Sequence, residues 1–112
     1  MIPGPFATKI LSDLGATIIK IEDAKRGDTL SSFPPYAFDN EAFLSVYFNK
    51  NKTRLKLDFT KPEGREVIFK LAQKADVVLE SFRPGAMKKW FLDAKSLHRK
   101  NPQLIYASLT GF

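Results

Sequence analysis

The chain has no cysteine and a single histidine among its 112 residues. Without thiols, this sequence cannot form a disulfide framework, a thiolate metal site or a cysteine nucleophile. The lone His98 argues against a histidine-based metal site, and its place beside Arg99 and Lys100 indicates an exposed residue. We therefore expect no bound metal.

Long apolar runs are also missing. No run approaches the roughly 20 residues that span a bilayer, and the first residues lack the basic start and apolar stretch of a signal peptide. We therefore expect a soluble cytoplasmic protein that contacts no membrane. The six glycines form neither a G-x-G-x-x-G fingerprint nor a P-loop, and no serine sits in a nucleophile elbow.

What is present points to one folded domain with an anionic partner. Hydrophobic residues make up 44% of the chain and charged residues 27%, close to the averages for globular proteins. The net charge of +6 favours binding to nucleic acid, a membrane surface or a phosphorylated cofactor. Charge alone does not choose among these three.

Hydrophobic periodicity predicts helices that alternate with strands. Thr60 and Glu63 match a capping box, with Pro62 in the first turn, which predicts that a helix starts there. The apolar run Val77 to Leu79 is typical of a buried parallel strand. The predicted helices cover 5–14, 41–48, a segment from Thr60 to Ala72, 84–91 and 94–100; the predicted strands cover 17–22, 54–59, 76–82 and 104–109, and residues 23–40 form a loop.

This alternation predicts an α/β fold: a Rossmann-like parallel sheet with helices on both faces. The sheet looks incomplete at both ends, because the chain enters at a helix without a preceding strand and leaves at a strand without a following helix. Ligands of such sheets bind beyond the carboxyl ends of the strands. We expect three strand ends to lie along one edge.

The first of these ends is Ser81 to Gly85. Arg83 supplies a fork of donors, Gly85 permits close backbone approach, and the expected helix start offers free amides, which together suit a phosphate. The alternative is an ordinary turn with a surface arginine. At the second end, Asp58 is either a working carboxylate or a turn cap, and the third, the charged loop 22–28, is typical of a solvated surface.

A basic run follows a group of aromatic residues and raises a further alternative. Such a pattern can bind single-stranded nucleic acid, but aromatics at helical spacing are more often core, so we expect no nucleic-acid partner. The residues concerned are Lys50, Lys52, Arg54 and Lys56, preceded by Phe43, Tyr47 and Phe48.

Read together, the motifs resemble the class III coenzyme A transferases (the CaiB/BaiF family) over essentially the whole chain. Each motif is weak alone, but their order and spacing are specific. They are Gly4–Thr8, Asp13–Ala16, Ile19–Glu22, Gly27-Asp28, Asn49–Lys52, Leu57-Asp58, Pro62–Gly64, Ala75–Val77, Glu80–Gly85, Asn101–Ser108 and Gly111-Phe112.

The resemblance implies that 1–112 is the N-terminal part of a coenzyme A-binding large domain. By position, the family's coenzyme contacts fall at Ile2, Pro3, Asp23, Leu57, Asp58, Phe59, Thr60, Ser81, Phe82, Arg83 and Lys89. The chain departs from the family at four positions, where a basic residue, asparagine, arginine and glycine are usual: Asp23, Ser81, Lys89 and Phe91.

The family's reaction moves coenzyme A between carboxylic acids through an aspartyl-CoA thioester. The resemblance places the nucleophilic aspartate beyond Phe112, so this chain has no catalytic residue by position, and the small domain is likewise absent. Coenzyme A and acyl-CoA are substrates, and no tightly bound cofactor is implied. Full-length members form interlocked homodimers. There are two alternatives to a transferase: an acyl-CoA racemase of the same fold, and a non-catalytic coenzyme A-binding fragment.

Overall fold

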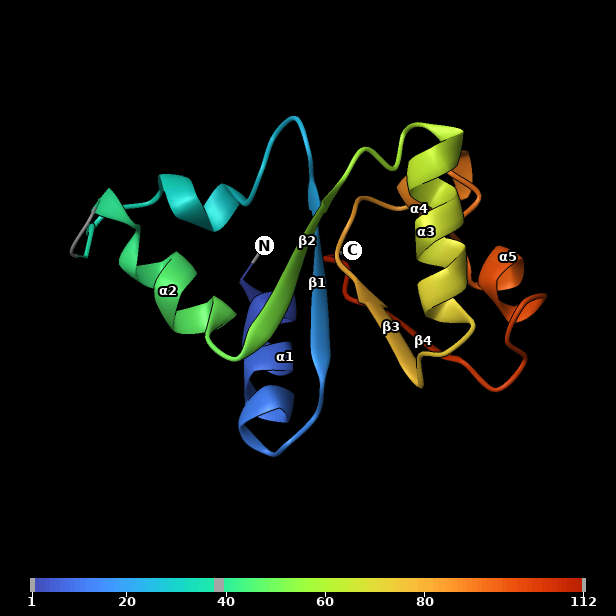
Figure 1. The fold of residues 1–112 in the computed structure, drawn as a ribbon, viewed down its shortest axis with the longest axis horizontal. Helices are drawn as coiled ribbons and strands as arrows, with labels where there is room; N and C mark the ends of the chain where they lie inside the picture. The colour runs from blue at the N-terminus through green and yellow to red at the C-terminus, as the bar shows by residue number, and fades with distance from the viewer. Residues whose placement is uncertain (1, 38–39, 112) are drawn as a thin grey trace. The chain divides into compact units, whose positions relative to one another are not determined.

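The computed structural model describes residues 2–37 and 40–111. Phe38 and Asp39 of the predicted loop, and Met1 and Phe112 at the chain ends, lie outside the described residues. The chain divides into two compact units, unit 1 from Met1 to Leu57 and unit 2 from Asp58 to Phe112. Each unit contains helices and one pair of parallel strands (Figure 1).

In unit 1, strands β1 and β2 pair in parallel from Ile18 opposite Lys52 to Asp23 opposite Leu57. Helix α1 precedes β1, and the crossover from β1 to β2 passes through η1 and α2 (Figure 1). The bounds are α1 Pro3–Asp13, β1 Ile18–Asp23, the 3-10 helix η1 Thr29–Ser32, α2 Phe43–Asn49 and β2 Lys52–Leu57.

Unit 2 repeats this plan with β3 and β4, which pair in parallel from Val77 opposite Ile105 to Glu80 opposite Ser108. A helix again precedes the first strand, and two short helices make the crossover (Figure 1). The bounds are α3 Pro62–Ala72, β3 Val77–Glu80, α4 Ala86–Lys89, α5 Ala94–His98 and β4 Ile105–Ser108.

The predicted α/β class with parallel strands is confirmed. Both ends of α1 follow the sequence signals. Pro3 and Pro5 lie in its first turn. After its last residue, Gly15 has a φ of +99°, the left-handed conformation that favours glycine after a helix. All four predicted strands are present, with bounds shifted by one or two residues. The expectation that the strand ends share one edge stays a prediction.

Four local predictions are wrong. The capping box does not form, because Lys61 is the N-cap of α3 and the Thr60 hydroxyl bonds to Asp58 instead. Helix α4 stops at Lys89. Val77 of the supposedly buried strand is exposed. His98 is half-buried, with its Nε2 2.8 Å from the Leu104 carbonyl oxygen.

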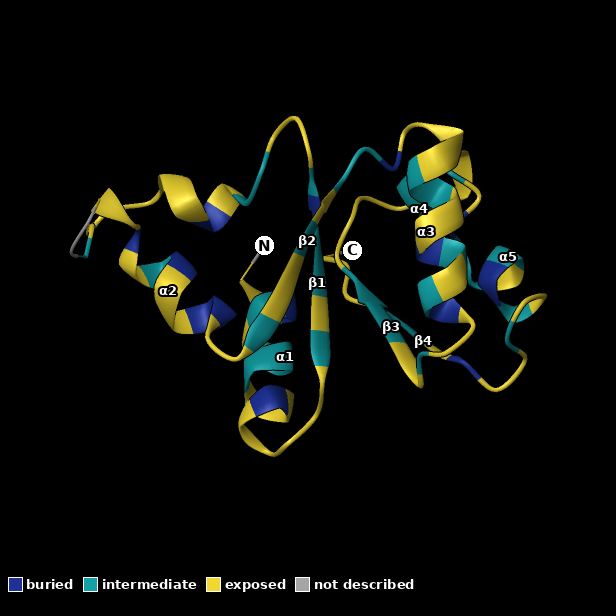
Figure 2. Ribbon diagram, in the orientation of Figure 1, coloured by how far each residue is buried: buried dark blue, intermediate teal, exposed yellow. Residues whose placement is uncertain are grey.

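Both units contain buried residues (Figure 2), and these differ in kind between the units. Unit 1 buries a few apolar residues, which are Leu30, Ala42 and Phe48, together with the polar residues Ser12, Glu22, Ser45 and Asn49. Unit 2 buries the apolar residues Phe59, Ile68, Ala72, Leu92, Leu97 and Leu104. Within the described ranges, no helix has the length and apolar character needed to cross a membrane.

Candidate functional site

The carboxyl ends of β1 and β2 bring two of the predicted contacts side by side. Asp23 and Leu57 are register partners, and the amide of Ala24 donates to the Leu57 carbonyl over 3.1 Å. The Asp23 carboxylate accepts the Lys25 amide at 2.8 Å, so it holds the turn after β1. Asp23 therefore has a structural role in this turn.

The other two predicted contacts of unit 1 lie at the start of α1. Ile2 is the N-cap of the helix and Pro3 its first residue, and both are exposed. Neither supplies a side-chain hydrogen bond, so their contribution to a ligand would come from apolar surface and backbone.

Next to the strand ends lies a charged network that the sequence did not predict. Arg54 binds Glu22 through two hydrogen bonds, Nε to Oε1 at 2.7 Å and Nη2 to Oε2 at 3.2 Å. Lys20 bonds to Asp28 and, at 2.9 Å, to Asn49, and its ammonium lies 3.3 Å from Glu22. The side chains of Glu22 and Asp28 are thus buried, which corrects the view of 22–28 as a solvated loop at its two ends, while residues 24–26 are exposed as expected.

The network lowers the pKa of both carboxyl groups. Burial raises the pKa of Glu22, but the hydrogen bond from Arg54 and the charge of Lys20 outweigh it, so the net shift is downward. Burial likewise opposes ionisation of Asp28, and its bonds from Lys20, the Leu30 amide and Asn49 bring its pKa below the usual value. Both groups are therefore charged at neutral pH.

An aromatic cluster forms where β3 ends in unit 2. The Phe59 ring meets Trp90 edge to face with centroids 4.9 Å apart, and Phe82 contacts both, at 6.0 Å from Phe59 and 5.3 Å from Trp90. The structure thus brings the predicted contacts Phe59 and Phe82 together. Sequence reasoning assigned Trp90 only to a helix, whereas the structure places it directly after α4 as the C-cap residue.

Asp58 and Thr60 form a tight turn beneath this cluster. The Asp58 carboxylate accepts the Thr60 amide at 3.2 Å and also the Thr60 hydroxyl. Helix α3 then passes so close that a Cβ on Gly64 would lie 2.2 Å from the Asp58 carbonyl oxygen, so this position requires glycine. Asp58 is thereby a turn cap, the second of the two readings from sequence.

The segment Ser81 to Gly85 is exposed throughout. The Phe82 amide donates to Glu80 at 2.8 Å, and Gly85 adopts a φ of +82°. Because α4 has only four residues, it has little dipole, and the predicted helix-terminus contribution to phosphate binding is not supported. Arg83 and, at the end of α4, Lys89 are exposed cations.

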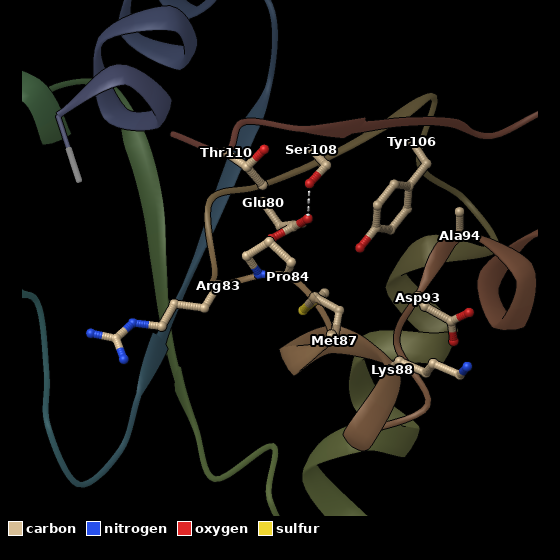
Figure 3. A pocket seen from close by; sticks show the side chains of 11 residues that line it. Glu80, Arg83, Pro84, Met87, Lys88, Asp93, Ala94, Tyr106, Ser108 and Thr110 are labelled. Carbon is tan, nitrogen blue, oxygen red and sulfur yellow. Dashed lines mark hydrogen bonds between the residues drawn. The ribbon is translucent and has the colours of Figure 1, made fainter. Parts of the chain in front are cut away.

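Unit 2 also contains a cavity of about 380 Å³ beside Arg83 and Tyr106 (Figure 3). The Ser108 hydroxyl donates to Glu80 across one wall, while the Arg83 side chain extends away from the other lining residues (Figure 3). Burial, followed by the charges of Glu80 and Asp93, raises the pKa of Tyr106 to about 12, so its hydroxyl remains a donor.

Within the described part of the chain, no group of three or more histidine, aspartate or glutamate residues could hold a metal ion. The site is thus made of exposed cations, aromatic rings and backbone turns at strand ends. Such groups can bind a phosphorylated, partly aromatic ligand.

The chain is similar in sequence and in fold to proteins of known family. Acetyl-CoA:oxalate CoA-transferase of Acetobacter aceti is 39% identical over 112 residues, covering 100% of this chain and 28% of that protein. Succinate–glutarate CoA-transferase of Agrobacterium fabrum is 37% identical over 118 residues, covering 100% and 30%. A crystal structure of a CAIB/BAIF family protein from Brucella suis superposes with a TM-score of 0.89 at 39% identity, covering 96% of this chain and 29% of that one.

The chain therefore spans between a quarter and a third of the length of these relatives. The family model described as CoA-transferase family III matches residues 1–112, the whole of the sequence. On that match and on these identities, the chain belongs to CoA-transferase family III.

Proposed function

We propose that the chain is the coenzyme A-binding part of a transferase that moves coenzyme A between carboxylic acids. The observation that carries this is the unbroken family match, since relatives that align with all of this chain are named CoA-transferases. Those names favour a transferase over the racemase alternative. The acid substrates, a cytoplasmic location and an interlocked homodimer are part of the proposal for the whole protein.

Each unit contributes residues to the proposed binding. In unit 2, exposed Phe82 offers a ring to a base or to the pantetheine chain, and Arg83 and Lys89 offer positive charge to phosphates. Ser81 supplies one hydroxyl. In the adjoining turn Leu57–Thr60, Thr60 is exposed and Phe59 is buried in the aromatic cluster.

In unit 1 the proposed contacts are Ile2 and Pro3 at the start of α1 and the turn after β1. The Asp23 carboxylate is engaged with backbone amides there, so the positive charges come from Lys25 and Arg26, which follow it and are exposed. This arrangement accounts for an aspartate at a position where the family usually has a basic residue.

The reaction we propose is covalent catalysis. An aspartate carboxylate attacks the acyl-CoA carbonyl and expels the CoA thiolate, which leaves a mixed anhydride. The thiolate then attacks the aspartyl carbonyl of the anhydride, forms an aspartyl-CoA thioester and releases the carboxylate of the donor acid. The incoming acid takes the coenzyme by the same two steps in reverse.

The aspartates described here are not assigned to these steps. Asp28 lies in the charged network and Asp58 caps a turn, and by position neither matches the family's nucleophile. The role we assign to this chain is to hold coenzyme A.

Titration of the protein with coenzyme A, followed by amide NMR, tests the proposal. We expect shifts at Phe82 and Arg83 that saturate, and affinity about tenfold weaker in Arg83→Ala, which removes charge-assisted hydrogen bonds. Arg99→Ala is the matched control, because Arg99 is an exposed arginine of the same unit at the end of α5.

Pyrophosphate serves as a second control, because a chain of net charge +6 attracts any polyanion. If coenzyme A produces no saturable shifts, or no more than pyrophosphate does, the proposed ligand is wrong. Equal losses of affinity in Arg83→Ala and Arg99→Ala would mean that binding is non-specific.

A further inference from the structure

Lys52, the first residue of β2, has an unusual set of partners. Its Nζ donates to the Pro5 carbonyl oxygen at 2.9 Å and to the Thr8 hydroxyl oxygen at 2.7 Å, both on α1. The Thr8 hydroxyl in turn donates to the Gly4 carbonyl at 2.8 Å, which leaves its oxygen to accept from Lys52. Both partners of this lysine are therefore neutral.

The charges around Lys52 favour loss of its proton. Lys9 approaches from α1 and Lys20 from β1, while Asp28, in the loop before η1, is already bonded to Lys20 and Asn49. Burial, then the charge of Lys20 and, more weakly, that of Lys9 lower the pKa of Lys52 to about 8, although Asp28 opposes them. Among the described residues, no carboxylate forms an ion pair with Lys52.

The same geometry suits a neutral amine. An uncharged lysine has two N–H donors, and the Pro5 and Thr8 oxygens accept both. The remaining position on the nitrogen is then taken by its lone pair. A lysine in partly buried surroundings and next to other cations is a recognised form of activated nucleophile.

We propose that Lys52 is an acylation site, a nucleophilic lysine that accepts the acyl group of an acyl thioester. The inference rests on the proposed function, which brings acyl-CoA thioesters to this protein. The neutral Nζ attacks the thioester carbonyl carbon, a C–N bond forms and the C–S bond breaks. The thiol of coenzyme A leaves with the proton that the amine loses, and an amide remains on Lys52.

The test compares Lys52 with Lys56, an exposed lysine of the same strand, in one sample. The protein is incubated with S-acetyl-N-acetylcysteamine, a small thioester without a nucleotide, and peptide mass spectrometry gives the acetylation rate of each lysine. Near pH 7.5 an amine with a pKa of about 8 is neutral about 200 times more often than one with the ordinary lysine pKa of 10.5. The less basic amine is also the weaker nucleophile, which offsets part of this gain. We therefore expect Lys52 to be acetylated about tenfold faster than Lys56.

The dependence on pH provides a second readout. The labelling rate of Lys52 should level off as the pH rises past its pKa of about 8. Lys52→Arg should remove the fast component of total acetylation, and the matched variant Lys56→Arg should retain it. Labelling of Lys52 no faster than that of Lys56, or a fast component that survives in Lys52→Arg, would overturn the proposal.

A parallel incubation with acetyl-CoA separates this inference from the proposed function. Saturation of Lys52 labelling with acetyl-CoA concentration supports both. If the small thioester labels Lys52 rapidly while acetyl-CoA labels it without saturation, the reactive lysine stands, and the NMR titration described above decides whether coenzyme A binds elsewhere on the protein or not at all.

Discussion

The two units place the same elements around a parallel strand pair, yet they are stabilised by different interactions. In unit 1 the strand pair carries Glu22 and Arg54 facing each other, and Lys20 connects them to Asp28. In unit 2 the Ser108 hydroxyl donates to Glu80 across the strand pair, and the rings of Phe59, Phe82 and Trp90 contact one another near the end of β3. Unit 1 therefore buries polar side chains beside a few apolar ones, whereas the side chains that unit 2 buries are apolar.

The comparison shows that a short parallel pair can be supported either by ion pairs or by apolar packing. Buried ion pairs require a complete set of partners, since a lone buried charge is costly. Apolar packing requires complementary volume, since cavities are costly. The two units should therefore respond to different perturbations, and the following experiments test that difference.

The largest effect should come from a cavity in unit 2. Leu97 of α5 has no exposed surface, so Leu97→Ala should lower the free energy of unfolding by about 3 kcal/mol. The measurement is urea unfolding followed by fluorescence of Trp90, the single tryptophan, which lies in unit 2. In the control Ile105→Ala, on a residue that is 62% exposed, the loss should stay below about 1 kcal/mol. Equal losses in the two variants would contradict an apolar core at α5.

Acid should act on unit 1 first. Glu22 and Asp28 have pKa values below those of the unfolded chain, so the unfolded state binds protons more readily as the pH falls. Their contribution to stability is complete above about pH 4.5 and is lost as the pH falls through the folded-state values. Amide exchange during an acid titration should show protection lost in β1 and β2 before α3 and β3.

Asp28→Asn provides the control for this titration. The variant should be less stable at neutral pH, because Lys20 loses one of its two ionic partners, but it should lose less stability on further acidification. Protection lost first in α3 and β3, or an unchanged acid profile in Asp28→Asn, would show that the network does not set the acid stability of unit 1.

Much of the fold was predictable because its signals are local. Pro5 lies in the first turn of α1 and Gly15 follows its end, as their own backbone preferences favour. The alternation in 54–59 identified β2 to within two residues. The capping box failed because two local interactions compete: the Thr60 hydroxyl can bond to the α3 amides or to Asp58, and the sequence does not show which it chooses.

The site was less predictable because it depends on register. Whether Glu22 meets Arg54 is decided by the pairing of Lys20 opposite Arg54, which no local pattern states. Alternating charges on two strands that were both correctly predicted are nevertheless a usable signal for such a network. The partners of Lys52 lie 44 and 47 positions earlier in the chain, and nothing in the pattern around Lys52 links it to Thr8 or Pro5.

The smallest expected effect concerns the turn that follows Trp90. Phe91 follows α4 with a φ of +58°, a left-handed conformation that is costly for any residue with a Cβ, and the resemblance places glycine at this position in the family. Phe91→Gly should raise the free energy of unfolding by about 1 kcal/mol. Little is lost with the ring, because Phe91 is 64% exposed and its contact with Arg65 is at the surface.

Phe91→Ala separates the backbone from the side chain, since alanine removes the ring but keeps the Cβ. Urea unfolding followed by Trp90 fluorescence should therefore place Phe91→Gly above both the wild type and Phe91→Ala in stability. If glycine and alanine are equally stabilising, the gain comes from removing exposed apolar surface. Backbone strain at Phe91 would then make no measurable contribution to the stability of unit 2.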